Sequence, residues 1–266
     1  MPINSHKQTG NVELFLSAYK NCDDVLLFWR SKVGAELDQP IPNCIGFCIE
    51  RQRKDVNNNW GPTEILRNRV GFTDNPPEIE EGDNNYPTQP SNIWPFQRYN
   101  WTDHGANNGQ IVRYRIIAVS LPESGTIGEV VLLSIADTDW TTEIIVNAVA
   151  DEIYEAYFNR GTVMSQYISR IMRLNNWTPA ELKAHIREIE EPVRRFLSGE
   201  LRNILLALLD EVIENLQLEF YAALYELSDP ELIDRLKLLR GRAHIVLSNG
   251  SDPDDGNALA RVQLKS

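Results

Sequence analysis

Apolar residues in the first half of the chain occur in short runs that are separated by turn-forming residues. Asn, Asp, Pro and Gly cluster between the runs, and no helical spacing intervenes. The expected strands are residues 12–19, 25–29, 45–53, 111–120, 130–135 and 143–149. Several short strands joined by turns predict an antiparallel β-sandwich, which we assign to residues 1–148.

Residues 73–100 lie between two of these strands and are rich in Pro, Asn, Asp and Glu. Loops of this length are uncommon and are usually functional or disordered. The aromatic residues at its end and just beyond are Trp94, Phe96, Tyr99 and Trp101. We expect them to pack on the edge of the sandwich, with a carbohydrate or protein contact surface as the alternative.

Near residue 150 the apolar spacing changes from strand-like to helical. One more strand is expected at residues 153–158, followed by a helix over residues 162–174. The next helix begins with Thr178 as its cap, Pro179 at the first position and Glu181 three residues after the cap. That combination is typical of a capping box followed by a helix.

The remaining chain alternates between helix and strand. A helix opens at Pro192, or is capped by Ser198, and its wide apolar stripe over residues 201–216 is typical of a helix packed on a sheet. Apolar strands are expected at residues 220–224 and 243–247, with a helix capped by Ser228 between them. This order predicts a partial α/β domain over residues 149–266, so the chain combines two domains of an α+β protein.

The two last strands form a strand–helix–strand unit, which implies a parallel pair. In open α/β sheets, ligands bind just beyond the carboxyl ends of the strands. Those ends are Tyr225 and Glu226 after the first strand, and Ser248 and Asn249 after the second. The acidic turn at residues 251–257 follows, and its spacing does not fit a calcium-binding loop.

Composition narrows the function classes. The chain has 266 residues, 42% of them hydrophobic, and a formal net charge of −12 that both halves share. This acidity disfavours nucleic acid as a partner. The basic residues Arg194, Arg195 and Arg202 are explained more easily as a solvated helix face than as a phosphate-binding patch.

Cysteine usage and hydropathy indicate the compartment. Cys22, Cys44 and Cys48 make an odd number at spacings unlike a zinc site, so we expect buried free thiols. No apolar run reaches the length of a membrane span, and the polar start lacks a secretory signal. A reducing cytoplasm is the expected location, and no metal or cofactor is expected.

Several phrases of the chain resemble large bacterial phospholipase D-like proteins. They are AYFNRGTVMSQYISR at residues 156–170, FLSGELRNILL at residues 196–206, and the three phrases YAALYEL, SDPELIDRL and RAHIVLSNG within residues 221–250. Earlier phrases around residues 42–50, 68–72 and 94–103 are similar to the fibronectin-III-like region that precedes the α/β part in such proteins.

The resemblance implies phosphodiester chemistry. In this family two halves each contribute an H-x-K-x4-D motif: one histidine forms a phosphohistidine, the other protonates the leaving oxygen, and lysines hold the phosphate oxygens. Here none of His6, His104, His185 and His244 has lysine two positions later. We therefore expect a leading portion of a longer enzyme that lacks its C-terminal catalytic segment and is inactive alone, and no catalytic residue carries over.

Residues near the expected site remain candidates for substrate contact. Asn159, Arg160 and Gly161 follow a strand and open a helix, where an anion meets N–H groups, although a simple loop in which Gly161 supplies the turn is the favoured explanation. The other candidates are Ser165, Glu200, Tyr225, Glu226 and Asn249. For most of these positions, helix capping or dipole interactions are the simpler explanation.

Three functional interpretations follow. The first is a phospholipase D-like phosphodiesterase that acts on a phosphodiester substrate in the full protein. The second is a non-catalytic module whose sandwich recognises a protein or glycan, and the third is a structural protein. The strand at residues 243–247 is expected to be an unprotected edge, which favours self-association.

Overall fold

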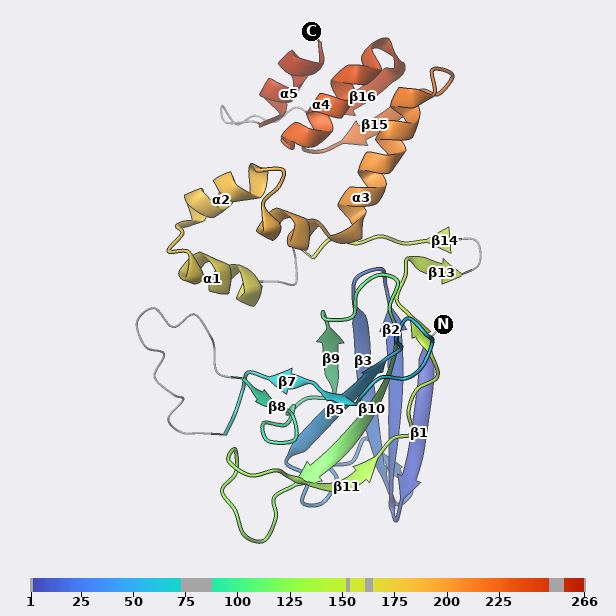
Figure 1. The fold of residues 1–266 in the computed structure, drawn as a ribbon, viewed down its shortest axis with the longest axis vertical. Helices are drawn as coiled ribbons and strands as arrows, with labels where there is room; N and C mark the ends of the chain where they lie inside the picture. Colours follow the sequence, from blue (N-terminus) through green and yellow to red (C-terminus); the bar gives the residue numbers. More distant parts are fainter. Residues whose placement is uncertain (1, 73–87, 152–153, 161–164, 249–255, 266) are drawn as a thin grey trace. The chain divides into compact units, whose positions relative to one another are not determined.

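The computed structural model describes residues 2–72, 88–151, 154–160, 165–248 and 256–265 (Figure 1). The chain divides into two compact units, Met1–Tyr157 and Phe158–Ser266. We call the first the sheet unit and the second the α/β unit. The sequence placed the boundary after residue 148; the sheet unit extends further and includes a short hairpin of β13 (Val149–Asp151) and β14 (Tyr154–Glu155).

The sheet unit contains two five-stranded antiparallel sheets. The first has the order β1 (Ile3–Thr9), β2 (Val12–Lys20), β3 (Val25–Val33) and β4 (Glu36–Leu37), and β9 (Asn100–Asp103) also pairs with β3. The second has the order β11 (Leu133–Asp137), β10 (Ile111–Ser120), β5 (Gly46–Arg53) and β6 (Glu64–Ile65), and β12 (Ile144–Ile145) also pairs with β10. Two short strands, β7 (Arg67–Asn68) and β8 (Gln89–Pro90), pair separately.

One hydrophobic core joins the two sheets. Leu14, Leu27 and Trp29 of the first sheet and Ile49 and Ile116 of the second belong to the same buried cluster. Strand alternation explains this packing, because successive side chains point to opposite faces and one face of each sheet is apolar. The structure also buries Trp94 and Phe96, which supports packing rather than surface exposure for those two aromatics.

The first two helices of the α/β unit overlap the ranges that the sequence predicts. α1 spans Ser165–Leu174 and α2 spans Pro179–Arg187, and the predicted capping box of Thr178 and Glu181 is present. The helix that the sequence opens at either Pro192 or Ser198 is α3 (Pro192–Glu214), with a kink at Gly199 inside it. Gly199 has φ 54° and ψ −155°, a backbone conformation that essentially only glycine adopts.

The last part of the α/β unit is a parallel strand pair with helices. β15 (Phe220–Leu224) and β16 (Ala243–Leu247) pair in parallel, with Tyr221 opposite His244, and α4 (Pro230–Leu239) connects them through a short 3-10 turn. The predicted strand–helix–strand unit is therefore confirmed. The cap of α4 is Asp229 and not Ser228, because the Asp229 carboxylate accepts the N–H of Leu232.

Two features of this unit differ from the sequence prediction. Helix α5 (Gly256–Leu264) begins within the range 251–257 that the sequence assigned to a turn, of which residues 251–255 lie outside the described structure. The apolar stripe of α3 is only partly buried: Leu209 packs in a core with α4, β15 and β16, whereas Leu205 and Leu208 are exposed. Leu216, which the sequence included in the stripe, lies beyond the end of the helix. The strand pairs described in the sheet unit are antiparallel, and β15–β16 is parallel. With the helices of the α/β unit, the molecule is therefore mixed α/β.

Candidate functional site

Asn257 at the start of α5 ties the carboxyl ends of the parallel strands together. Its side-chain N–H group donates to the carbonyl oxygens of Tyr225 at 2.8 Å and Ser248 at 3.2 Å, and its oxygen accepts the N–H of Leu227 at 2.7 Å. The Ser248 hydroxyl also donates to the Tyr225 carbonyl, at 2.6 Å. Asn257 is only 3% exposed, so these hydrogen bonds are buried beneath the carboxyl ends of the two strands.

Two predicted candidates, Tyr225 and Glu226, lie directly after the carboxyl end of β15. The Tyr225 residue is 86% exposed, and Glu226 is also exposed. Neither side chain has a hydrogen-bond partner among the residues that the structure describes. The structure therefore brings these two together with Ser248, while Asn249 lies outside the described residues. Asn257 was missed by the sequence analysis, because its neighbours 251–256 indicated a turn.

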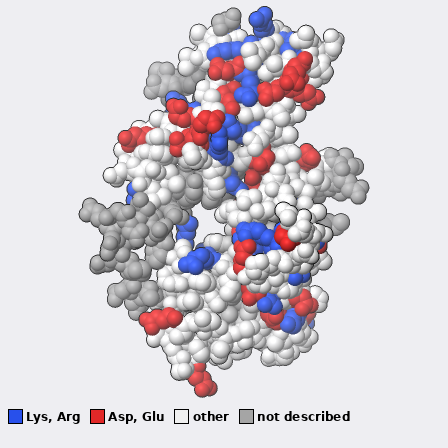
Figure 2. Space-filling view, in the orientation of Figure 1, with Lys and Arg blue, Asp and Glu red and all other residues white. Residues whose placement is uncertain are grey.

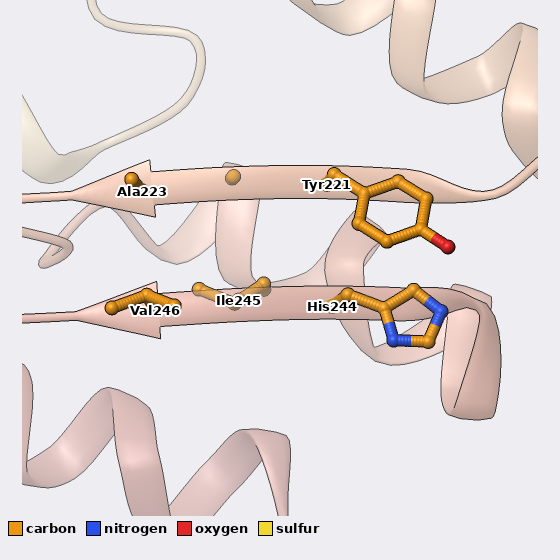
Figure 3. Close-up of a pocket in the computed structure, with 6 residues that line it drawn as sticks. Tyr221, Ala223, His244, Ile245 and Val246 are labelled. Atoms are coloured by element: carbon orange, nitrogen blue, oxygen red, sulfur yellow. The ribbon is translucent and has the colours of Figure 1, made fainter.

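The exposed face of β15 and β16 forms a shallow depression of about 540 Å³, shown in Figure 3. The rings of Tyr221 and His244 stack there with centroids 4.5 Å apart and planes 16° apart. The Tyr221 hydroxyl donates to Glu219, which raises the pKa of the phenol, and Glu219 lies 3.5 Å from His244 Nε2. The His244 side chain is exposed.

This depression lacks the groups that phosphoryl chemistry needs. Its floor is Ala222, Ala223, Ile245 and Val246, and no lysine or arginine is among the described residues that line it. Tyr221 and His244 sit near the amino ends of their strands, away from Tyr225 and Ser248. His244 lies beside Glu219, but neither a second histidine nor a lysine or arginine is among the described residues that line this depression.

The candidates at the start of the α/β unit lie elsewhere. Arg160 is only 7% exposed. Its backbone N–H donates to the Leu197 carbonyl at 2.8 Å, and its guanidinium lies 4.8 Å from the centre of the Phe196 ring. Asn159 is exposed, and Gly161 lies outside the described residues. Arg160 therefore packs against α3 near its kink and is not presented to solvent.

Glu200 and Ser165 do not join this group in the described contacts. Glu200 lies directly after the Gly199 kink, and its carboxylate accepts the side-chain N–H of Asn203 at 3.3 Å. Ser165 is the first residue of α1, and its side chain is outside the described part of the structure. No hydrogen bond or ion pair that the structure describes links Arg160 or Glu200 to Tyr225 or Glu226.

A buried ion-pair network is the strongest electrostatic feature of the α/β unit. Glu231 of α4 accepts two hydrogen bonds from Arg202, at 2.7 and 2.9 Å, and one from Arg194 at 3.0 Å. Arg194 also pairs with Asp229 at 2.8 Å. The interpretation of Arg194 and Arg202 as a solvated helix face is wrong, because Arg194 is only 6% exposed and both hold α3 against α4; Arg195 alone faces solvent.

These partners lower the pKa values of the two carboxylates in the network, Glu231 and Asp229. Burial raises the pKa of Glu231, but the hydrogen bonds from Arg202 and Arg194 outweigh it, so the pKa lies below its ordinary value. Burial likewise raises the pKa of Asp229, and Arg194 together with the Leu232 N–H lowers it further than burial raises it. Each carboxylate is therefore ionised at neutral pH and is held by arginine side chains, so we interpret the network as structural.

Other chemistry-bearing groups do not form a site in the described residues. No cluster of three His, Cys, Asp or Glu that is able to hold a metal occurs there. All three cysteines are free thiols; Cys22 and Cys48 are buried, and Cys44 is half-buried. None of the described helices combines the length and the apolar character that a membrane crossing requires. Acidic and basic side chains are interspersed on the face in Figure 2.

Comparison of the chain with protein-family models, with curated proteins and with solved structures found no match.

Proposed function

We propose that the α/β unit is part of a phospholipase D-like phosphodiesterase and that the sheet unit is its fibronectin-III-like N-terminal domain. The observation that carries the proposal is the parallel β15–α4–β16 unit, in the segment whose phrases resemble that family. Its carboxyl ends meet at Tyr225, Glu226 and Ser248, where open α/β sheets bind their ligands.

The residues of this chain supply the rim of such a site and not its chemistry. Tyr225 and Glu226 project into solvent from the strand end, whereas Asn257 and Ser248 hold the backbone of that end in place. A phosphohistidine mechanism additionally needs histidine and lysine side chains directed at phosphorus. None of the four histidines stands in an H-x-K motif, so the chain of 266 residues is expected to be inactive alone.

The test is to express the complete reading frame that contains this chain beside the 266-residue chain. We expect the complete product to hydrolyse bis(4-nitrophenyl) phosphate and to form an acid-labile phosphohistidine, and the shorter chain to do neither. Replacement of the first histidine of an H-x-K-x4-D motif by alanine is expected to abolish both signals. A complete reading frame without that motif would overturn the proposal.

A second candidate function is recognition of a protein or glycan by the sheet unit. Its support is a row of alternating rings and cations on the outer side of β10, which we call the Trp–Arg stack. The Arg113 guanidinium lies 4.2 Å from the Trp60 ring centre and 5.0 Å from that of Trp140, and Arg115 lies 5.0 Å from Trp140. Tryptophan and arginine are the side chains most enriched at binding hot spots.

The Trp–Arg stack is distinct from the aromatics that the sequence singled out. Of those four aromatics, Trp94 and Phe96 are buried, Trp101 is half-buried and Tyr99 is exposed. A glycan array and a panel of extracellular and cytosolic proteins, probed with the whole chain and with Trp140→Ala, test the second function. A ligand whose binding depends on Trp140 supports it, and a ligand bound equally by both chains contradicts a role for the stack.

A further inference from the structure

The α/β unit contains a groove along β16 that is separate from the strand ends. It has a volume of about 860 Å³ and is lined by residues of β16, α4 and α5. Its apolar lining comes from all three elements: Ala243, Ile245 and Leu247 of β16, Leu236 of α4 and Leu264 of α5. These side chains border the same core as Ile233 and Ala260, so the groove is an open continuation of the core.

The backbone of β16 faces this groove with unused hydrogen-bonding groups. Ser248 N–H donates to the Leu224 carbonyl of β15 at 2.9 Å. Because the peptide groups of a strand alternate in direction, those of Val246 and His244 also face β15, and those of Ile245 and Leu247 face the opposite edge. In the described part of the chain β16 pairs with β15 alone, so this edge is open to a further strand.

The rim of the groove is basic in a chain whose net charge is −12. Four cations border it, namely Lys237, Arg240, Arg261 and Lys265. Lys237 pairs with Asp234, and Arg261 donates to the Ser248 carbonyl. Arg240 and Lys265 are exposed and have no acidic partner among the described residues. An occupant with acidic side chains would complement this rim.

We propose that this groove binds an extended segment of a second polypeptide, with alternating apolar and acidic side chains, as an additional strand on β16. Its backbone would pair with Ile245 and Leu247, and its inward side chains would pack on Leu236 and Leu264. Strand addition obtains affinity from main-chain hydrogen bonds and specificity from alternate side chains. The acidic side chains would meet Arg240 and Lys265.

The charge distribution also argues against a second copy of the chain as the occupant. Two copies of the chain each carry a net charge of −12, which opposes their association through this edge. Like charges disfavour association, so a second copy is a poorer occupant than a segment whose acidic side chains meet Arg240 and Lys265. The edge of β16 is thus unpaired among the described strands, as expected from the sequence. The charges around it favour an acidic segment of another polypeptide over a second copy of the chain.

The first experiment measures binding of labelled synthetic peptides to the 266-residue chain by fluorescence anisotropy. We expect a short peptide of alternating valine and glutamate to bind saturably, more weakly as salt rises. A valine–lysine peptide should not bind. A valine–glutamate peptide with alternate amides N-methylated should lose binding, because it lacks the donors that a strand needs. Equal binding of the three peptides overturns the proposal.

A matched pair of variants tests the location. Arg240→Glu with Lys265→Glu reverses the rim charge and should weaken binding by about tenfold or more. Lys183→Glu with Arg187→Glu changes the net charge equally at exposed positions on α2, outside the groove, and should leave affinity unchanged. If both pairs weaken binding to the same extent, the attraction is to net charge and the groove is not the site.

Hydrogen exchange tests strand addition independently of charge. On binding of the valine–glutamate peptide, the amides of Ile245 and Leu247 should become more protected, while those of the sheet unit stay unchanged. No added protection at those amides overturns strand addition, and so does dimerisation of the chain through β16. Binding by the 266-residue chain but not by the complete reading-frame product would assign the groove to the chain's own later segment and refute a separate partner.

Discussion

Glu231 accepts hydrogen bonds from two arginines of α3, and its loss would leave Arg202 and part of Arg194 uncompensated in a buried position. Breaking a buried ion pair from one side costs about 3 kcal/mol or more. We expect Glu231→Ala to lower the free energy of unfolding by about that amount in urea titrations. Glu190→Ala removes the exposed carboxylate that pairs with Arg195 and should cost at most about 1 kcal/mol. Equal effects would contradict a buried network.

The same network predicts how stability depends on pH. The folded-state pKa of Glu231 lies below its ordinary value of 4.5, and that of Asp229 below 3.8. Carboxylates with lowered pKa values contribute stability that is complete above the ordinary value and is lost as pH falls through the folded value. The free energy of unfolding of the α/β unit should therefore decrease below about pH 4.5. In a Glu231→Gln variant the decrease should be shallower, and an unchanged pH slope would contradict the assignment.

Single residues also mark where sequence reasoning reaches its limit. The capping box of Thr178 and Glu181 was predictable because its partners are three residues apart. Arg194 gave no local sign of burial, because Glu231 is 37 positions away along the chain. Likewise, Asn257 forms hydrogen bonds to Leu227 and Tyr225, which are 30 and 32 positions away along the chain. Its role therefore follows from tertiary structure alone.

At the scale of elements, Asn257 is the connection between α5 and the parallel strands. Its side chain makes three hydrogen bonds to backbone groups while almost fully buried. Asn257→Ala would leave the Leu227 N–H and two carbonyl groups without this partner, at a cost of about 2–3 kcal/mol. We expect faster hydrogen exchange at Leu227 and through α5. Asn203→Ala, which removes one exposed bond to Glu200, should leave exchange there unchanged.

Elements were predicted well wherever the signal was local. The alternating strands, the helix starts and the parallel β15–α4–β16 order followed from periodicity and caps. β1 was missed because Ile3–Thr9 is an edge strand with polar side chains and little alternation. α5 was missed because the acidic, turn-forming sequence of residues 251–257 overlaps its first two positions and predicted a turn there. The two alternatives for α3 were both partly right, since Gly199 interrupts a helix that does begin at Pro192.

At the scale of the whole molecule, the two units have separate cores. Leu27 is fully buried among the strands of the sheet unit, and Leu239 is 1% exposed among α3, α4 and α5. Because no core cluster contains residues of both units among the described residues, each unit should unfold in its own transition. Calorimetry of the chain should then resolve two thermal transitions, provided that their midpoints differ.

Two core variants decide whether those transitions are independent. Truncation of a buried leucine to alanine costs about 2–5 kcal/mol, because it loses transfer free energy and leaves a cavity. Leu27→Ala should lower only the transition of the sheet unit, and Leu239→Ala only that of the α/β unit. Glu231→Ala should shift the same transition as Leu239→Ala, since both act on the packing of α4. If either leucine variant lowers both transitions, the units fold as one cooperative body and the separate-core argument fails.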